Sequence, residues 1–332
     1  MIRNARLTDR PALAELARRV AERGNDDRHT LGLPGRREDT ERVPLATLIP
    51  SWLPLRAPSL HLVYEENGRI MGSCRALEEP HRPDWVIVEL DAGDHPMASE
   101  VRFQLLQGVV AEGAQRHVAR FHAACSAAPE NLELFNQLAF VAYAEEQILY
   151  RAPDATRSGA NGAPGGGADE FVPAQPAHAW HMFRLWSEVT PPTVARTDGY
   201  RAADWETADR EAVVPRSSLT PLLRFADVRS WLLPDDGGAA AFVQHGLSRR
   251  GPHYLRMLAG PRIDPARVVA AAISAAGPAA RRAGILTPVR TYEPPLRIAA
   301  EDVGFELAGV VTLLIREVRA SVRQPAMVPA VQ

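Results

Sequence analysis

The chain has 332 residues, and its 38 basic and 40 acidic side chains leave a formal net charge of −2, so its charge does not point to nucleic acid or an anionic membrane surface. All 38 basic residues are arginine, and the absence of lysine excludes a pyridoxal-phosphate Schiff base, a lysine-dependent aldolase and a lysine-containing phosphate-binding loop. The two cysteines, Cys74 and Cys125, suggest neither a disulfide framework nor a zinc site, and the length favours two domains of roughly 150 residues.

The apolar segments of the chain are too short to cross a membrane. The longest uncharged one, residues 268–280, is rich in alanine and interrupted by Gly277 and Pro278, whereas a spanning helix needs about 20 apolar residues. The opening residues (MIRNAR) also lack the apolar stretch of a signal peptide. We therefore expect a soluble, cytoplasmic protein with no nucleic-acid or membrane partner.

The first half of the sequence alternates predicted strands and helices. Helical spacing of apolar residues predicts helices over 10–23, 99–117 and 129–138. Short apolar runs predict strands over 59–64, 70–76, 85–90, 120–125 and 141–150, with a hairpin turn at residues 66–69. This order indicates an α/β fold with a mixed sheet flanked by helices.

A break in composition separates the two halves. Residues 153–176 contain five glycines between Gly159 and Gly167, four prolines, and no large apolar residue before Phe171. Such a segment cannot bury enough surface to order itself, so we predict a flexible linker. It follows no predicted strand and has no lysine, which argues against a phosphate-binding loop.

A similar order recurs more loosely after the linker. Strands are predicted over 180–186, 239–245, 253–259, 285–292 and 310–316, with a turn at 248–251. Helices are predicted over 191–200 and over the Ala-rich segment 265–284.

Four segments resemble the GNAT N-acetyltransferase superfamily. Residues 2–9 (IRNARLTD) resemble its first strand and helix start, and residues 61–72 (HLVYEENGRIMG) its second and third strands. Residues 134–140 (LFNQLAF) resemble the end of its late helix, and residues 303–306 (VGFE) resemble the same ending again. The resemblance implies two GNAT-like domains in tandem: 1–152, then the linker 153–176, then a degenerate copy over 177–323 and a tail over 324–332.

The sequence departs from this family at the loop that binds the pyrophosphate of acyl-CoA. There the family places a Q/R-x-x-G-x-G/A motif at a helix N-terminus, where amides and the helix dipole bind the anion. Counting back from Leu105 and Leu106 puts Glu100 and Arg102 at the small-residue positions, and the second half puts Arg267 and Val269 there. Glu100 would repel pyrophosphate, whereas Arg102 could contact it.

The catalytic positions are only partly retained. The family's usual general acid, a tyrosine on the late helix, aligns with Phe135 and Ala300, neither of which can donate a proton. Glu89 lies where the family often places the carboxylate that deprotonates the acceptor amine. The alternative is that Glu89 shares one strand face with Trp85 and Ile87 and is simply solvated.

The resemblance implies direct acyl transfer from acetyl-CoA, a co-substrate, to the amine of a small molecule or peptide. The thioester would be held between two splayed central strands, and no metal is implied. Glu89 is then the candidate base, and the candidate acetyl-CoA contacts are Leu90, Ala92, Ser99 and Arg102. The alternative is a non-catalytic ligand-binding or scaffold protein that has lost acyl-CoA chemistry, because fold does not settle function. The assembly would be a monomer with pseudo-dimeric halves or a homodimer.

Overall fold

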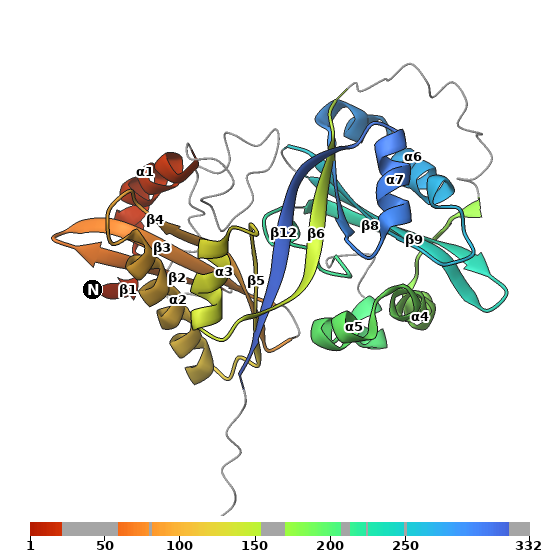
Figure 1. The fold of residues 1–332 in the computed structure, drawn as a ribbon. Helices are drawn as coiled ribbons and strands as arrows, with labels where there is room; N and C mark the ends of the chain where they lie inside the picture. The colour runs from red at the N-terminus through yellow and green to blue at the C-terminus, as the bar shows by residue number, and fades with distance from the viewer. Residues whose placement is uncertain are drawn as a thin grey trace, which may run out of the picture.

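The computed structural model describes residues 1–21, 59–79, 82–153, 170–206, 213–223, 225–248 and 251–318. Most of the predicted linker (154–169) and the whole predicted tail (324–332) lie outside the described residues. The structure is a mixed α/β fold, as the sequence predicts, and the elements of the two halves follow one another in a similar order (Figure 1).

The first half contains six strands and three α-helices among its described residues. They are β1 (Ile2–Asn4), α1 (Arg10–Ala21), β2 (Ser59–Glu66), β3 (Arg69–Glu78), β4 (Asp84–Ala92), α2 (Ala98–Gln115), β5 (Arg120–Cys125), α3 (Pro129–Gln137) and β6 (Val141–Arg151). Every helix and strand predicted over the described part of this half is present, with shifts of a few residues at the ends.

The described part of the second half begins within the predicted linker. Its elements are β7 (Val172–Pro173), α4 (Ala179–Val189), α5 (Pro192–Asp198), β8 (Phe225–Asp235), β9 (Gly238–Ser248), β10 (His253–Ala259), α6 (Pro265–Ala283), β11 (Ile285–Arg290), α7 (Pro294–Asp302) and β12 (Glu306–Glu317). Within α6 the backbone breaks from helical geometry at Gly277, directly before Pro278. Neither β7 nor β8 is anticipated by the sequence patterns.

One predicted strand is wrong, because residues 180–186 belong to helix α4. The buried side chains of this helix are Ala179, Met182, Leu185 and Trp186, and these recur at intervals of three to four residues. Trp180 is exposed. The aromatic residues suggest a strand, but the spacing of the buried positions is helical, and packing of that apolar face decides the outcome.

All twelve strands of the described residues join in one sheet with the order β1-β2-β3-β4-β5-β12-β6-β11-β10-β9-β8-β7. This order is symmetrical about its centre, because each half contributes five strands on its own side and one long strand to the middle. The last strand, β12, pairs antiparallel with β5 and β6, while β6 pairs with β12 and β11. Figure 1 shows β6 and β12 side by side between the two halves. Each half therefore completes its sheet with the closing strand of the other.

Helices cover the two faces of the sheet in the same way in each half. On one face, α2 and α3 cover the first half, with Leu105 and Phe135 in its core, and α6 and α7 cover the second half. On the other face, α1 packs on the first half and α4 on the second. Residues 213–223 also pack on this face, where Leu219 and Leu223 contact a buried cluster that includes Ile148 and Tyr254.

Candidate functional site

Strands β4 and β5 diverge in the first half of the sheet. Their parallel pairing covers only Asp84↔Arg120, Trp85↔Phe121 and Val86↔His122. Beyond Val86, β4 stays paired with β3 alone, and β5 continues against β12. The edge of β4 that faces β5 therefore has no strand partner over residues 87–92. We call this opening the first splay.

A β-bulge at Val88 accompanies the divergence. Ile87 pairs with Ala76 and Glu89 pairs with Arg75, so Val88 is an extra residue on β4. A bulge bends its strand and changes which face the following side chains occupy. Trp85 and Ile87 lie in the core beneath α2, whereas Glu89 lies beside Arg75 on the opposite face. The expectation that Glu89 shares a face with Trp85 and Ile87 is therefore wrong, because the bulge intervenes.

Strands β10 and β11 diverge in the same way in the second half, after the pairs His253↔Ile285 and Tyr254↔Leu286. This second splay is bridged by a buried ion pair. Arg256 and Glu293 make two contacts of 2.9 Å, with side chains only 3% and 5% exposed. Arg256 Nη1 also donates to the carbonyl of Pro288 on β11 at 3.3 Å. These contacts link β10 to β11 and to the N-cap of α7 across the splay.

The first splay lacks the ion pair that bridges the second. Arg256 lies two residues beyond the last paired residue of β10, and the same count on β4 reaches Val88, the extra residue of the bulge. Counted from the other end, Arg256 and Glu89 each lie three residues before the end of their strand, so Glu89 takes the place of Arg256 opposite the neighbouring strand. Glu293 precedes α7 at its N-cap, and the corresponding residue before α3 is Ala128. The two halves therefore share a fold but differ in what occupies the splay.

Glu89 is held by two neighbours on β3. Its carboxylate is 3.0 Å from Nε of Arg75 and accepts a hydrogen bond from the Ser73 hydroxyl at 3.4 Å. Burial acts to raise the pKa of Glu89, but the charge of Arg75, the His61 ring and these hydrogen bonds outweigh it, so the pKa lies below its ordinary value. Glu89 is thus a half-buried, ionised carboxylate rather than a solvated one.

The remaining predicted site residues follow Glu89 along the chain. Leu90 and Ala92 are on β4, with side chains buried in the core beneath α2. Ser99 is exposed in the first turn of α2, and Arg102 is half-buried in the second. The structure thus brings Glu89, Leu90 and Ala92 to the unpaired part of β4, with Ser99 and Arg102 at the start of the helix that follows.

The start of α2 differs from a glycine-rich anion-binding loop. Glu100 and Arg102 lie within the helix, and Glu100 accepts a hydrogen bond of 2.6 Å from Gln104, one turn further along. Met97 at the N-cap has no side-chain hydrogen bond to the helix. The amide of Gly93 donates to the carbonyl of Met71 at 2.7 Å, so it is already engaged.

The close approach of α2 to the sheet depends on Gly72. A Cβ atom at this position would lie 2.6 Å from Cγ1 of Val101 and 2.8 Å from the carbonyl oxygen of Asp91. Any side chain would push the first turn of α2 away from β3 and from the end of β4. This is the physical reason for the glycine in the motif over residues 61–72.

A cavity of about 40 Å³ lies at the junction of the two halves. From the first half it is lined by residues 86–88 of β4, residues 122–124 of β5 and Tyr143 of β6. From the second half, residues 216–218 and Arg290 line it. Because Ile87 and Val88 belong to the first splay, this junction cavity lies directly beside it.

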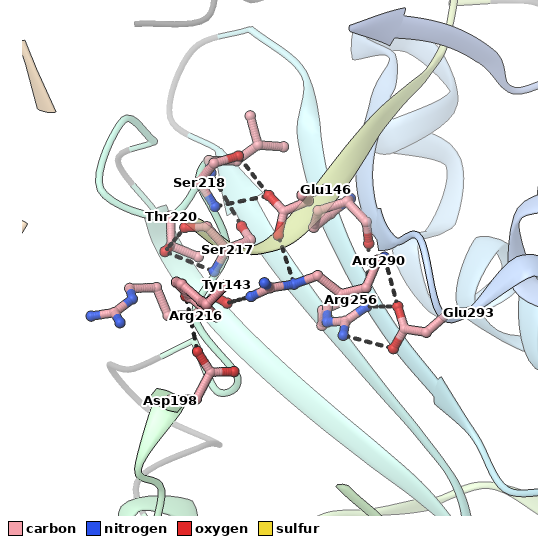
Figure 2. A network of polar contacts seen from close by, with 12 residues as sticks. Tyr143, Glu146, Asp198, Arg216, Ser217, Ser218, Thr220, Arg256, Arg290 and Glu293 are labelled. Atoms are coloured by element: carbon pink, nitrogen blue, oxygen red, sulfur yellow. Dashed lines mark hydrogen bonds and ion pairs between the residues drawn. The ribbon is translucent and has the colours of Figure 1, made fainter. Parts of the chain in front are cut away.

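Two buried arginines of the second half reach this cavity. Arg290 pairs with Glu146 of β6, Nε to Oε2 at 3.1 Å, and Glu146 also accepts from the Ser218 amide at 2.8 Å and hydroxyl at 2.5 Å (Figure 2). Arg216 lies 2.9 Å from Glu79 and 2.8 Å from Nδ1 of His122. These contacts fix residues 216–218 against the first half.

Two further groups of the network have shifted pKa values. The Tyr143 hydroxyl donates to Asp198 at 3.0 Å, and burial, reinforced by the Asp198 charge, raises its pKa above the ordinary value. Burial and the charge of Arg216 lower the pKa of His122 to about 4, against the opposing effect of Asp84. Tyr143 therefore stays protonated and His122 stays neutral near pH 7.

The sequence analysis does not anticipate this network. Its members are single charged residues inside apolar strands, such as Arg256 between Leu255 and Met257, or Arg290 after Val289. A buried charge requires a partner. A single charged residue inside an apolar strand therefore indicates that a group of opposite charge lies close to it in the fold. The partner itself cannot be read locally, because Glu146 is on β6 and Arg290 on β11.

None of the helices in the described ranges has the length and apolar character required to cross a membrane. The sequence matches no protein-family model. No curated protein matches it either.

The symmetrical sheet, the two splays and the exchanged closing strands define an α/β protein with two GNAT-like halves. Over nearly its whole length the chain is similar to a tandem GNAT protein from the clavulanic acid biosynthesis pathway, solved without acetyl-CoA. The identity is 12%, the TM-score is 0.57, and the match covers 96% of this chain and 98% of that one. It is also similar to a GCN5-related N-acetyltransferase from Sphaerobacter thermophilus, with 12% identity, a TM-score of 0.55 and 96% of each chain covered. The chain thus has the fold of tandem GNAT proteins.

Proposed function

We propose that the protein is an acetyl-CoA-dependent N-acyltransferase with one active site, in the first half. The observation that carries the proposal is the difference between the two splays. The first has Val88 and Glu89 at the level of Arg256, and Ala128 at the position of Glu293, so no counterpart of the Arg256–Glu293 ion pair bridges it. A thioester can enter the first only, because the second already contains a buried bidentate pair.

The residues present fit the acyl-pantetheine arm. The edge of β4 over residues 87–92 has backbone amides and carbonyls without a strand partner, and the two amide groups of pantetheine can pair with such an edge as a short strand does. The pyrophosphate would meet the first turns of α2, where Ser99 and Arg102 are the candidate contacts. Arginine binds phosphate oxygens through its planar fork, which makes it a substitute for the missing glycine amides.

In this proposal the amine attacks the thioester carbonyl directly. A carbon–nitrogen bond forms, the carbon–sulfur bond breaks, and the proton of the amine passes to Glu89, directly or through a water. CoA leaves as a thiolate and takes its proton from solvent. An ordinary thiol has a pKa of about 8.5, so the thiolate is a good leaving group and the absence of a tyrosine at Phe135 is tolerable.

Calorimetric titration with acetyl-CoA tests the proposal. The wild type should bind, and the double variant Val88→Arg/Ala128→Glu, which introduces an arginine and a glutamate on the two sides of the first splay, should not. The thermal midpoint of the variant shows whether it is folded. The matched control is Arg256→Leu/Glu293→Leu, which removes both charges of the ion pair in the second splay. It should leave the affinity for acetyl-CoA unchanged.

The second candidate function is non-catalytic ligand binding or scaffolding. It is favoured by Glu100 within the first turn of α2 and by the apolar Phe135 at the tyrosine position. No binding of acetyl-CoA by the folded wild type at millimolar concentration would reject the enzyme and leave this alternative.

A further inference from the structure

The junction cavity lies beside the first splay, so an amine bound next to it would be close to a thioester held in the splay. It is lined by Val86 and Val88 on β4 and by Ala123 and Ala124 on β5, the two strands that form the splay. Its opposite wall comes from the second half. An acceptor in the cavity would therefore contact the first half at its reacting end and the second half at its other end.

The charged side chains that line this cavity are Arg216 and Arg290, both from the second half. Their acidic partners Glu79 and Glu146 are not among the lining residues, and no other acidic residue of the described chain is. Arg216 is already occupied by Glu79 and His122. Positive charge therefore faces the cavity from one side, and the other polar residues that line it, His122, Tyr143, Ser217 and Ser218, carry no acidic group.

Arg290 retains one donor group without an acceptor. Its side chain is 4% exposed, its Nε contacts Glu146, and its Nη2 donates to the carbonyl of Arg216 at 3.1 Å. Its Nη1 is buried and has no hydrogen-bond partner within the described residues. A buried donor left unpaired is unfavourable, so an anionic or carbonyl oxygen in the cavity would be favoured there.

Ser217 supplies a second donor. Its hydroxyl oxygen accepts hydrogen bonds of 3.2 Å from the Leu219 amide and from the Tyr254 hydroxyl. Ser217 is the acceptor in both bonds, so neither uses its hydroxyl hydrogen, and Ser217 lines the cavity. A guanidinium nitrogen and a hydroxyl together form a pair of donors suited to a carboxylate.

The size of the cavity favours a carboxylate over a larger anion. A volume of about 40 Å³ holds about three water-sized groups, which matches the three heavy atoms of a carboxylate. A phosphate monoester group is larger and tetrahedral. The nearness of the cavity to the splay also limits the acceptor to a short molecule, with amine and carboxylate a few bonds apart.

We infer that the junction cavity receives the carboxylate end of an amino-acid-like acceptor amine and that Arg290 and Ser217 bind this carboxylate. This inference rests on the proposed function, since it assigns the acceptor of the same site. The second half, whose own splay is bridged, then serves the reaction by recognising the acceptor.

The experiment compares free amino acids with their carboxamides as acceptors, for example glycine with glycinamide and L-alanine with L-alaninamide. CoA release is followed with a thiol reagent. An adjacent carboxylate makes an amine harder to deprotonate, so intrinsic reactivity favours the amides. We expect the opposite order, with kcat/KM at least about tenfold higher for the free acids. Equal or better use of the amides would overturn the inference.

Arg290→Lys tests the assigned residue while keeping a positive charge beside Glu146. It should raise KM for the free acid at least about tenfold and leave acetyl-CoA affinity unchanged. Arg256→Lys is the matched control, because Arg256 is equally buried and ion-paired but does not line the cavity. An unchanged KM in folded Arg290→Lys would overturn the inference.

Calorimetry without acetyl-CoA separates failure of this inference from failure of the proposed function. If no amine of either kind is acetylated, the proposed function fails, but glycine and L-alanine can still be titrated into the wild type. Binding of the acids but not of the amides, weakened by Arg290→Lys, would uphold carboxylate recognition. Absence of binding by these acids in that case would overturn it.

Discussion

At the scale of single residues, the site combines groups whose proton affinities are moved by burial and by charged neighbours. Glu89 is kept ionised by Arg75, and His122 is kept neutral beside Arg216. Both shifts follow from burial and from contacts with residues distant in sequence, not from adjacent residues. Each shift leads to a prediction about pH that can be measured.

Glu89→Gln should lower turnover about 10²- to 10⁴-fold, because the variant cannot accept the proton of the amine. Acetyl-CoA affinity, measured by calorimetry, should not change, since glutamine can still bond Ser73 and Arg75. Glu78→Gln is the matched control, because Glu78 also pairs with an arginine, Arg116, at 3.5 Å. Full activity in Glu89→Gln would remove this carboxylate from the mechanism.

The pH dependence of turnover should not contain a step from Glu89 between about pH 5 and 8. Its pKa is lowered from the ordinary carboxyl value, so it is already ionised across this range. The rise of turnover with pH should instead follow deprotonation of the acceptor amine. It should therefore shift when acceptors of different amine pKa are compared.

His122 makes the fold less stable in acid. Its pKa is about 4 in the folded protein, against an ordinary value of 6.5. Between these two values the unfolded chain binds more protons than the folded one, so stability is lost as pH falls from about 6.5 towards 4, by up to about 1.4 kcal/mol per pH unit. His245, whose pKa burial also lowers to about 4, adds to the same window.

The measurement is the urea midpoint of unfolding at several pH values across this window. His122→Gln removes the titrating ring but keeps one acceptor for Arg216 and one donor for Asp84. The variant should show a smaller loss of midpoint on acidification than the wild type. Parallel pH profiles for the two proteins would contradict the shifted pKa of His122.

At the scale of elements, the first half can be read from sequence because its periodicities are clear. Turn-forming residues mark the hairpin at residues 66–69. The periodic spacing of apolar residues marks the strand over 120–125 and helix α2. Helix α4 is misread because aromatic residues are compatible with a strand, and only the spacing of its buried side chains reveals the helix. Strand β8 is missed because it has few consecutive apolar residues.

The candidate site is predictable only in part for a related reason. The sequence predicts that Glu89, Leu90, Ala92 and the start of α2 lie near one another, because they are close together along the chain. The bulge at Val88 decides which face of the sheet Glu89 occupies, and no residue type in this segment indicates that a bulge is present. The ion pair in the second splay and the arginines of the junction cavity depend on strands that are distant in sequence.

At the scale of the whole molecule, the exchange of closing strands makes the two halves dependent on each other. β12 pairs with β6 from Glu306↔Tyr150 to Ile315↔Val141 and with β5 from Thr312↔Cys125 to Glu317↔Arg120. Without β12, the first half would expose the edges of both β5 and β6. Unpaired strand edges of this kind promote misassembly, so tandem fusion keeps the complementary strands in one chain.

This dependence predicts that the halves stay together after the chain is cut. A protease site inserted between residues 153 and 170 allows cleavage of the folded protein. The two pieces should elute as one complex in gel filtration and separate only in denaturant, because each contains a strand from the centre of the other's sheet. The uncut protein carrying the same insertion is the control.

The fragment that ends at residue 152, expressed alone, should fail to give a soluble monomer with cooperative unfolding. It keeps β6 but loses the strand that joins β6 to β5, so the sheet is broken between those two strands. Adding the second piece during refolding should restore solubility, since β12 then fills the gap. Two pieces that separate in native buffer, each folded and monomeric, would contradict the exchanged-strand sheet and with it the junction cavity, whose walls come from both halves.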